Sequence, residues 1–317
     1  MQMESYQPRV SIGMPVYNGE KFLEQAIDSI LAQTFADFEL IISDNASTDA
    51  TEKICQEYAN RDPRIRYYRN ETNLGAARNY NRTFELSTGE YFKWAAHDDL
   101  LAPTFLERCV EVLDNQPSVV LCYTCEICID ETGNHLQKRS NLIDFRLPKP
   151  HERFKQYHDS WQKQGFIHAN HCFGLIRANA LKKTPLIENY VWSELVLGGE
   201  LLLLGEFSEI PEYLFFFRCH SQTSRATKGR SGFNELAVWF DPNNQGKIVL
   251  PQWKIFFQYL SSIKRVPMNW SEKVSCYAQM GRWFSWKWKR LAKELILAIL
   301  QFFNKLVYGS PNKGLFV

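Results

Sequence analysis

The stretch VSIGMPVYNGEKFLEQAIDSILAQTFADFELIISDNASTDAT, residues 10–51, contains a complete strand–helix–strand unit. Its first segment, residues 10–16, is a short apolar run that predicts a buried strand. Residues 20–33 then place apolar side chains at helical spacing, and residues 38–43 form a second apolar run. A strand, a helix and a strand in this order predict two parallel strands joined by a right-handed crossover.

The same alternation continues along the chain. Further helices are predicted at residues 47–59, 76–86, 103–115 and 194–205, and further strands at residues 65–68, 90–95, 119–129, 171–177 and 213–218. Residues 135–165 are polar and contain two prolines near their middle, which favours a loop with a short helix, and the basic residues 221–232 should be mobile. The pattern predicts an α/β fold with a mostly parallel sheet and helices on both faces.

The composition limits the kind of protein that this chain can be. Its 317 residues are 45% hydrophobic and 23% charged, as in globular proteins, which excludes a disordered or collagen-like chain. The 37 Lys and Arg residues nearly balance the 35 Asp and Glu residues, and the net charge is +2. Because nucleic-acid binding relies on an excess of basic residues, we expect no nucleic acid among the partners.

Three features predict a cytoplasmic protein. The first residues, MQMESYQPRV, lack the apolar stretch of a secretory signal. The apolar tract at residues 295–303 is shorter than the roughly 20 residues that span a bilayer. Eight cysteines are too few for a disulfide scaffold of this length.

The end of the chain is helical, aromatic and basic. WFSWKWKR at residues 283–290 is followed by LAKELILAILQFFNKLVYG, and the whole of residues 236–317 forms an extension of this character. One interpretation is an interfacial helix that docks on anionic lipid at the inner face of the membrane. The other is a helix packed on the rest of the protein, with Trp and Lys at its rim.

Three polar clusters stand where predicted strands end: PVYNGE at residues 15–20, SDNASTD at residues 43–49 and HDD at residues 97–99. The carboxyl ends of parallel strands open at one edge of a sheet, where ligands bind. A carboxylate after the second strand can accept hydrogen bonds from a base or a ribose. An acidic pair after the fourth strand suits a hard divalent cation that bridges phosphates. Each cluster alone is also explained as a loop or a solvated turn, but their joint placement favours a ligand site.

The motifs P-V-Y-N, D-N-A-S-T-D, N-L-G-A-A-R-N and H-D-D-L-L-A-P, in this order, resemble those of family 2 glycosyltransferases, which have the GT-A fold. The resemblance is strong over residues 9–115 and looser to about residue 220. It implies a transferase that moves a sugar from a nucleotide sugar, with UDP-sugar as the expected donor, to a glycan or lipid-linked acceptor with inversion at the anomeric carbon. It also implies a role in surface polysaccharide or glycolipid synthesis. On this basis residues 1–235 are the expected catalytic domain, with a nucleotide-binding half at 1–115 and an acceptor half at 116–235.

The resemblance assigns the nucleotide-sugar site residue by residue. The implied residues are Pro15, Val16, Tyr17, Asn18, Glu20, Asp44, Asn45, Ser47, Arg78, His97 and Asp98. Asp98 aligns with the carboxylate that binds Mn²⁺ or Mg²⁺ in the family's Asp-x-Asp motif. Ala96 stands in place of the first Asp of that motif, so one metal-binding carboxylate is missing.

The resemblance also implies a general base and a second metal ligand. The family's base is a carboxylate about eleven residues before a Gly, and Glu194 stands at that spacing from Gly205. Glu200 is the second candidate, and the alternative for Glu194 is a carboxylate that only stabilises a helix N-terminus. Residues 218–224 resemble a family tail whose histidine, here His220, meets the metal or the diphosphate. The alternative is a structural histidine at a strand end.

Two other functions remain open at this stage. A sugar nucleotidyltransferase uses a similar sheet, but its Gly-rich basic first loop is absent from PVYNGE at residues 15–20. A non-catalytic nucleotide-sugar or glycan-binding module is compatible with Ala96 and with Glu rather than the commoner Asp at position 194. Fold similarity alone does not separate these functions, because function depends on the site.

Overall fold

The computed structural model describes residues 7–140, 143, 145–164, 171–221 and 233–308. The expected segment at residues 221–232 therefore lies almost wholly outside the described residues. The strands are β1 (Val10–Val16), β2 (Phe38–Asp44), β3 (Ile65–Arg69), β4 (Tyr91–Trp94), β5 (Leu100–Leu101), β6 (Val119–Ile129), β7 (His135–Arg139), β8 (Leu175–Arg177) and β9 (Glu206–Arg218). The helices are α1 (Leu23–Leu31), α2 (Thr51–Arg61), α3 (Ala76–Glu85), α4 (Phe105–Asn115), α5 (Pro150–Gln164), α6 (Ala178–Leu181), α7 (Ser193–Leu204), α9 (Phe233–Phe240), α10 (Pro251–Arg265) and α11 (Trp270–Tyr308), with a short 3₁₀ turn, η2 (Pro242–Asn244).

The strands of the described residues form one sheet in the order β3-β2-β1-β4-β8-β6-β9-β5, with β7 beside β6. The first four strands in this order, β3, β2, β1 and β4, are parallel, as the alternating sequence predicts. Strand β8 is antiparallel to both of its neighbours, and β6 and β9 are parallel to each other. The α/β architecture with a mostly parallel sheet is therefore confirmed, and the mixed pairings lie in its second half.

Both faces of the sheet are covered, which explains why β1 and β2 are buried at every residue. Helices α1 and α4 contribute to one hydrophobic core, and α3 and α7 contribute to another. Gly13 makes one of these contacts possible, because a Cβ at this position would lie 2.3 Å from Thr83 Oγ1 of α3.

The largest difference from the expectation concerns residues 135–165. The structure has a strand, β7, and a helix of 15 residues, α5, where a loop with a short helix is predicted. Helix α5 buries Phe154 and Tyr157, but its other positions are mostly polar, so its apolar periodicity is weak in the sequence. Strand β9 is also longer than predicted, and β8 covers only the last three residues of the expected strand.

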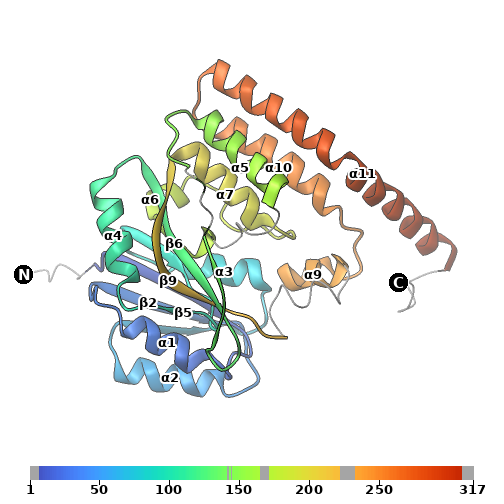
Figure 1. The fold of residues 1–317 in the computed structure, drawn as a ribbon. Coiled ribbons are helices and arrows are strands. Elements are labelled where there is room, and N and C mark those ends of the chain that lie inside the picture. The colour runs from blue at the N-terminus through green and yellow to red at the C-terminus, as the bar shows by residue number, and fades with distance from the viewer. Residues whose placement is uncertain (1–6, 141–142, 144, 165–170, 222–232, 309–317) are drawn as a thin grey trace, which may run out of the picture.

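The C-terminal helices form a third core with α5 and α7. Helices α10 and α11 lie side by side against them, and α11 runs along the outer edge of the molecule (Figure 1). Their shared core includes Phe154, Tyr259, Ile263, Met280 and Leu291. Among the helices of the described residues, none combines the length and the apolar character that crossing a bilayer requires.

Candidate active site

The loops that follow β1 and β2 are joined by hydrogen bonds. The backbone N–H of Asn18 donates to Ser47 Oγ over 2.9 Å, and the N–H of Thr48 donates to Asn18 Oδ1 over 2.8 Å. Asn18 and Ala46 have φ angles of 50° and 61°, in the left-handed region that residues other than glycine rarely adopt. Such conformations persist where the surrounding structure enforces them, and they are common at functional sites. The first two predicted clusters are therefore one bonded unit.

Asp44 lies beneath this unit and is fully buried. One carboxylate oxygen accepts the N–H of Ser47 at 2.9 Å, and the other accepts the hydroxyl of Tyr67 at 2.8 Å. Burial and the Asp44 charge together raise the pKa of Tyr67, so the phenol stays protonated and remains a donor. Arg69 Nε lies 3.6 Å from the same oxygen that Tyr67 contacts, so Asp44 holds together the end of β2, the following loop and β3.

Asn45 holds the neighbouring loop in place. Its Nδ2 donates to Asn73 Oδ1 over 2.8 Å, and its Oδ1 accepts from Leu74 N at 2.8 Å and from Asn70 Nδ2 at 3.1 Å. This amide network connects the end of β2 to the segment that leads into α3. The sequence signal for this network is the recurrence of Asn between β3 and α3, at Asn70 and Asn73, to which the sequence analysis assigns no role.

The remaining residues of the first cluster are placed along the end of β1. Pro15 and Val16 are buried in the strand, whereas Tyr17 is exposed at its end. Glu20 is exposed and accepts the N–H of Ala50 at 2.8 Å, so it caps the approach to α2. The accessible groups of this cluster are thus the Tyr17 ring and the Asn18 and Glu20 side chains.

Arg78 lies on the first turn of α3 with its side chain exposed. Its charge contributes to a lowered pKa of Asp241, where hydrogen bonds from Asn243 and Asn189 outweigh the opposing effect of burial. The structure therefore places Arg78 near the segment after α9, on the side of the sheet where the strand-end loops lie.

His220 and Asp98 meet in the structure, although they are 122 residues apart in sequence. His220 Nε2 lies 2.9 Å from Asp98 Oδ2, and the two side chains are 6% and 16% exposed. Burial opposes ionisation of Asp98, but the hydrogen bond from His220 and the charge of His97 hold its pKa below the usual value. The Phe22 ring packs against the imidazole at 4.9 Å between centroids.

His97 connects this pair to the first cluster. A Cβ built on Gly19 would lie 2.6 Å from His97 Cδ2, so only a glycine allows the imidazole to pack so closely on the turn after β1. All three predicted clusters therefore lie at the same edge of the sheet.

Arg218 is the main residue of this region to which sequence analysis assigns no role. It is fully buried, and its Nε donates to Asp98 O over 2.8 Å, while its Nη2 donates to Gln25 Oε1 over 2.8 Å. Its backbone N–H donates to Asp99 Oδ1 over 2.9 Å. Burial and the Asp98 charge raise the pKa of Asp99, whereas the pKa of Asp98 is lowered. Arg218 thus holds the HDD turn against the end of β9.

Glu194 stands in the first turn of α7, two residues after the unusual residue Trp192. Trp192 precedes the helix with a φ of 67°, a conformation that is strained for an aromatic residue. Glu194 lines a narrow cavity that Tyr157 and Cys172 also line. Burial raises the pKa of Tyr80, and the charges of Cys172, Asp98, Asp99 and Glu194 raise it further. The charges of Glu194 and Asp98 thus act on the same phenol in the same direction.

Two tyrosines hold the first turn of α7. The hydroxyls of Tyr157 on α5 and Tyr259 on α10 both donate to the Leu195 carbonyl, each over 3.0 Å. Two glycines admit them, because a Cβ on Gly198 would lie 2.9 Å from Tyr157 Oη and a Cβ on Gly199 would lie 2.7 Å from Tyr259 Cε1. The C-terminal extension thus contacts the residue next to Glu194.

Glu200, the second candidate base, is placed elsewhere. It is fully buried between α7 and α10, where its Oε2 accepts from Ser262 Oγ at 2.6 Å and from Arg265 Nη1 at 2.7 Å. Through these contacts the Glu200 carboxylate links α7 to α10. Glu194 therefore remains the candidate base.

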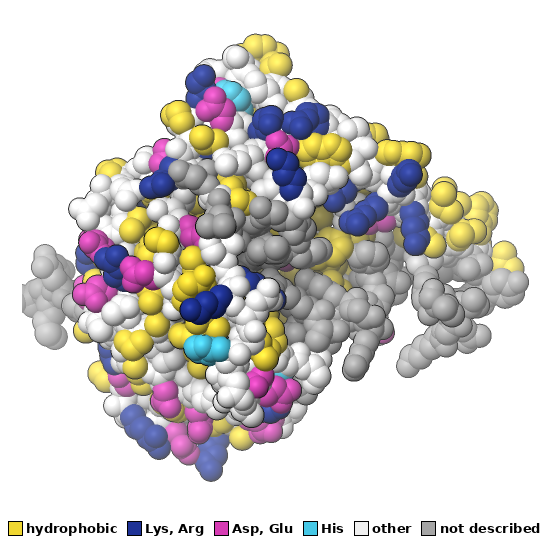
Figure 2. Space-filling model, viewed as in Figure 1, with side chains coloured by type: hydrophobic (Ala, Val, Ile, Leu, Met, Phe, Trp, Pro, Cys, Tyr) yellow, Lys and Arg dark blue, Asp and Glu magenta, His cyan; other side chains and the backbone are white. Residues whose placement is uncertain are grey.

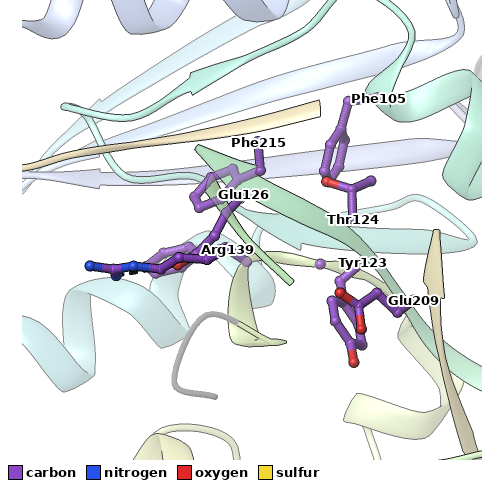
Figure 3. Close-up of a pocket in the computed structure, with 9 residues that line it drawn as sticks. Phe105, Tyr123, Thr124, Glu126, Arg139, Glu209 and Phe215 are labelled. Carbon is purple, nitrogen blue, oxygen red and sulfur yellow. Dashed lines mark hydrogen bonds and ion pairs between the residues drawn. The ribbon is translucent and has the colours of Figure 1, made fainter. Parts of the chain in front are cut away.

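A separate small cavity lies between β6, β7 and β9 (Figure 3). Glu126 and Arg139 form an ion pair of 3.4 Å at its wall, Phe215 lies beside Glu126, and Phe105 also lines the cavity. The ammonium of Lys93 lies over these two rings, and burial lowers its pKa to about 8. The cavity measures about 20 Å³, which admits roughly one water molecule and excludes a sugar.

The residues at the strand ends fit a divalent cation in part. Asp98 and His220 offer one oxygen and one nitrogen, Ala96 offers nothing, and Asp99 Oδ1 already accepts the Arg218 N–H. Within the described part of the chain, no group of three or more His, Cys, Asp or Glu residues is arranged to hold a metal ion. Because Mg²⁺ is commonly bound by one or two protein carboxylates together with substrate phosphates, the pair fits a cation that arrives with a diphosphate.

Comparison with known proteins connects this site to a family. The family model for glycosyl transferase family 2 matches residues 11–184, more than half of the chain. An uncharacterized glycosyltransferase of Methanocaldococcus jannaschii is 35% identical over 193 residues, which are 60% of this chain and 63% of that protein. The chain spans less than two thirds of the length of the curated relatives that it matches.

Solved structures share the fold at low sequence identity. Residues 1–349 of S. aureus TarS, also solved with UDP and with UDP-GlcNAc, match with a TM-score of 0.63 and 16% identity over 94% of this chain and 81% of that one. The mannosyltransferase PcManGT from Pyrobaculum calidifontis, in complex with GDP-Man and Mn²⁺, matches with a TM-score of 0.50 and 15% identity. The match covers 96% of this chain and 89% of that one. These likenesses confirm the GT-A fold. The match of the family model over residues 11–184 shows that the chain belongs to glycosyl transferase family 2.

Proposed function

We propose that this chain is an inverting glycosyltransferase that moves a sugar from a nucleoside-diphosphate sugar, UDP-sugar in the first place, to an acceptor hydroxyl. The observation that carries the proposal is the pair of Asp98 and His220, 2.9 Å apart, at the same sheet edge as the bonded loops around Asp44. The UDP and UDP-GlcNAc complexes of TarS, which has the same fold, support a uridine donor.

The donor would lie along the strand-end loops. The Tyr17 ring and the polar groups of Asn18 and Glu20 are accessible to the base and ribose, with Asp44 beneath them. Asp98 and His220 would hold a divalent cation together with the diphosphate. When bound, such a cation supplies positive charge that stabilises the departing diphosphate. The Mn²⁺ in the PcManGT complex supports this choice of metal.

Glu194 is proposed as the general base. Its carboxylate would accept the proton of the acceptor hydroxyl while that oxygen bonds to the anomeric carbon, and the bond from that carbon to the diphosphate oxygen breaks. Attack from the face opposite the diphosphate inverts the anomeric carbon. A single carboxylate suffices, because the leaving diphosphate needs no proton from a second carboxyl group, unlike the leaving group in a glycoside hydrolase.

The proposal assigns each part of the chain a task. Residues 1–115 would bind the nucleotide, and residues 116–235, which contain Glu194, would bind a glycan or lipid-linked acceptor for surface polysaccharide or glycolipid synthesis. Residues 236–317 would support the base through Tyr259. All eight cysteines lie among the described residues as free thiols, which supports a reducing, cytoplasmic setting.

The test is release of the nucleoside diphosphate by the full chain from UDP-, GDP- and dTDP-sugars with Mn²⁺ or Mg²⁺. Glu194→Gln should lower turnover by about 10²–10⁴-fold, as loss of a general base does, and should leave binding of UDP unchanged. Glu57→Gln, on the exposed face of α2, is the matched carboxylate control. Binding without turnover in the unmodified chain would favour a non-catalytic module. Pyrophosphate release from a nucleoside triphosphate and a sugar 1-phosphate would favour a nucleotidyltransferase.

A further inference from the structure

Helix α11 presents an apolar stripe to solvent along most of its length. The stripe consists of Tyr277, Phe284, Trp288, Leu295, Ile299 and Leu306, whose exposed fractions range from 38% to 66%. They follow one another at steps of seven and four residues, which correspond to two turns and one turn, so they lie on one face of the helix. Hydrophobic side chains gather toward the outer end of this helix in Figure 2.

A neighbouring face of α11, about a quarter turn from the stripe, is packed against the protein. Cys276, Trp283 and Leu291 are buried in the core that α11 shares with α5 and α10. Glu294 accepts the backbone N–H of Gln252, the second residue of α10, at 3.0 Å. A helix that is held on one side and apolar on the other fits the surface of a bilayer rather than its interior.

Aromatic side chains of α10 extend the stripe sideways. Phe257 is 55% exposed and its ring is stacked on Trp253 at 5.9 Å between centroids, and Trp253 in turn contacts the ring of Phe284 at 6.1 Å. Such rings concentrate where apolar and polar surroundings meet, as in the headgroup region of a membrane.

The net charge of the segment that contains the stripe identifies what would cover it. Residues 273–308 contain seven Lys and Arg residues and one acidic residue, Glu294, which faces α10. Lys289, Arg290 and Lys293 are exposed in succession. Anionic lipid headgroups attract a segment of this net positive charge, whereas a second copy of the same segment would carry a like net charge.

We propose that the apolar stripe of α11 binds an anionic lipid surface, with the helix lying parallel to the bilayer. The stripe residues and Phe257 enter the boundary between headgroups and acyl chains, and the positive charge of Lys289, Arg290 and Lys293, farther around the helix, adds electrostatic attraction to the anionic surface. This surface is independent of the proposed sugar transfer, since none of its residues lies at the strand-end loops or at Glu194.

The test is co-sedimentation of the full chain with vesicles of phosphatidylcholine, with and without phosphatidylglycerol. We expect binding to the anionic vesicles that weakens with salt. Ile299→Gln combined with Leu306→Gln should lower the partition coefficient by at least about tenfold, because two large apolar side chains leave the lipid boundary. Leu136→Gln, at a residue 59% exposed on β7, is the matched control and should bind like the unmodified chain.

The basic cluster is tested separately. Lys289→Glu combined with Lys293→Glu should weaken binding to anionic vesicles by at least about fivefold for each charge. Lys182→Glu with Lys183→Glu, an exposed pair beside α6, is the control. Equal binding by the stripe variant and the unmodified chain would overturn the proposal. So would a dimer in light scattering that the stripe variant dissociates and that does not bind vesicles. Thermal unfolding establishes that each variant is folded, and sugar transfer to a soluble acceptor is measured independently of vesicles.

Discussion

The hydroxyl of Tyr259 donates a 3.0 Å hydrogen bond to the carbonyl of Leu195, so the C-terminal extension contacts the helix turn that contains Glu194. Tyr157 donates to the same oxygen from α5. The extension is therefore part of the wall of the candidate site, as well as a surface feature.

Removing the Tyr259 hydroxyl should affect stability and turnover differently. Tyr259→Phe loses one hydrogen bond while Tyr157 keeps the carbonyl satisfied, so the free energy of unfolding should fall by only about 1 kcal/mol. Because the turn that holds Glu194 becomes less fixed, kcat should fall several-fold with little change in the KM for the donor. Steady-state kinetics and urea unfolding measure the two effects, with Tyr277→Phe on the exposed face of α11 as the control. A change confined to KM would contradict this role.

The nucleotide should stabilise the chain only when a divalent metal is present. At a hundredfold excess over its dissociation constant, a bound ligand adds about 2.7 kcal/mol to the free energy of unfolding. We expect a rise in Tm for UDP with Mn²⁺, a smaller one for GDP, dTDP and CDP, and none for Asp98→Ala. An equal shift without metal would show that Asp98 binds the nucleotide directly or has no part in binding.

Arg218 should be essential for the strand-end region to fold. Arg218→Met removes the donors that satisfy the Asp98 carbonyl and the Gln25 side chain in a buried setting, at a cost on the order of 3 kcal/mol. Arg64→Met, at a partly exposed arginine beside Phe38, should cost much less. Urea unfolding of both variants checks this, and equal stabilities would show that the buried contacts of Arg218 are replaceable.

Acid should destabilise the protein through His158. This histidine is buried against Phe154 and Tyr259, and burial lowers its pKa to about 4 from the ordinary 6.5. The folded state therefore keeps the neutral ring, while the unfolded state takes up a proton as the pH falls below 6.5. The stabilising contribution is complete above pH 6.5 and decreases toward pH 4, by at most about 3 kcal/mol.

Replacing His158 isolates this contribution. The loss of unfolding free energy between pH 7 and pH 5 should be smaller in His158→Leu than in the unmodified chain, whatever the stability of the variant at pH 7. His135→Gln, at an exposed histidine on β7, should leave the pH dependence unchanged. Parallel pH profiles for the two variants would show that another group is responsible.

Local patterns predicted the elements whose apolar residues repeat regularly. Strand β6 begins and ends at the predicted residues, Val119 and Ile129, because the segment is apolar except at Thr124 and Glu126. Helix α5 is longer than the short helix predicted, because charged residues interrupt its apolar positions. Its burial depends on contacts with α7 and α11. Helix α2 begins at Thr51 rather than at the predicted residue 47, because Ser47 belongs to the loop that bonds to Asn18.

The candidate site was predictable only where residues stand in a motif. The polar clusters at the strand ends were visible, and the structure brings them to one edge. Arg218 and Tyr259 were assigned no role, because one buried polar residue in a strand or helix leaves no periodic signal. Their partners, Asp98 and Leu195, lie 120 and 64 residues away. Such contacts are set by the packing of whole elements.

The spacing of the stripe on α11 has a geometric consequence. Tyr277 and Leu306 are about eight turns apart and point within about 20° of each other, so the stripe is nearly a straight line of roughly 43 Å. A molecule that touches a flat surface only along such a line can still rotate about the line. Phe257 of α10 supplies a contact point beside the line, and a line with a point outside it defines a plane. On a bilayer the molecule would thus have a single orientation, with Glu194 at a fixed height and tilt above the lipid.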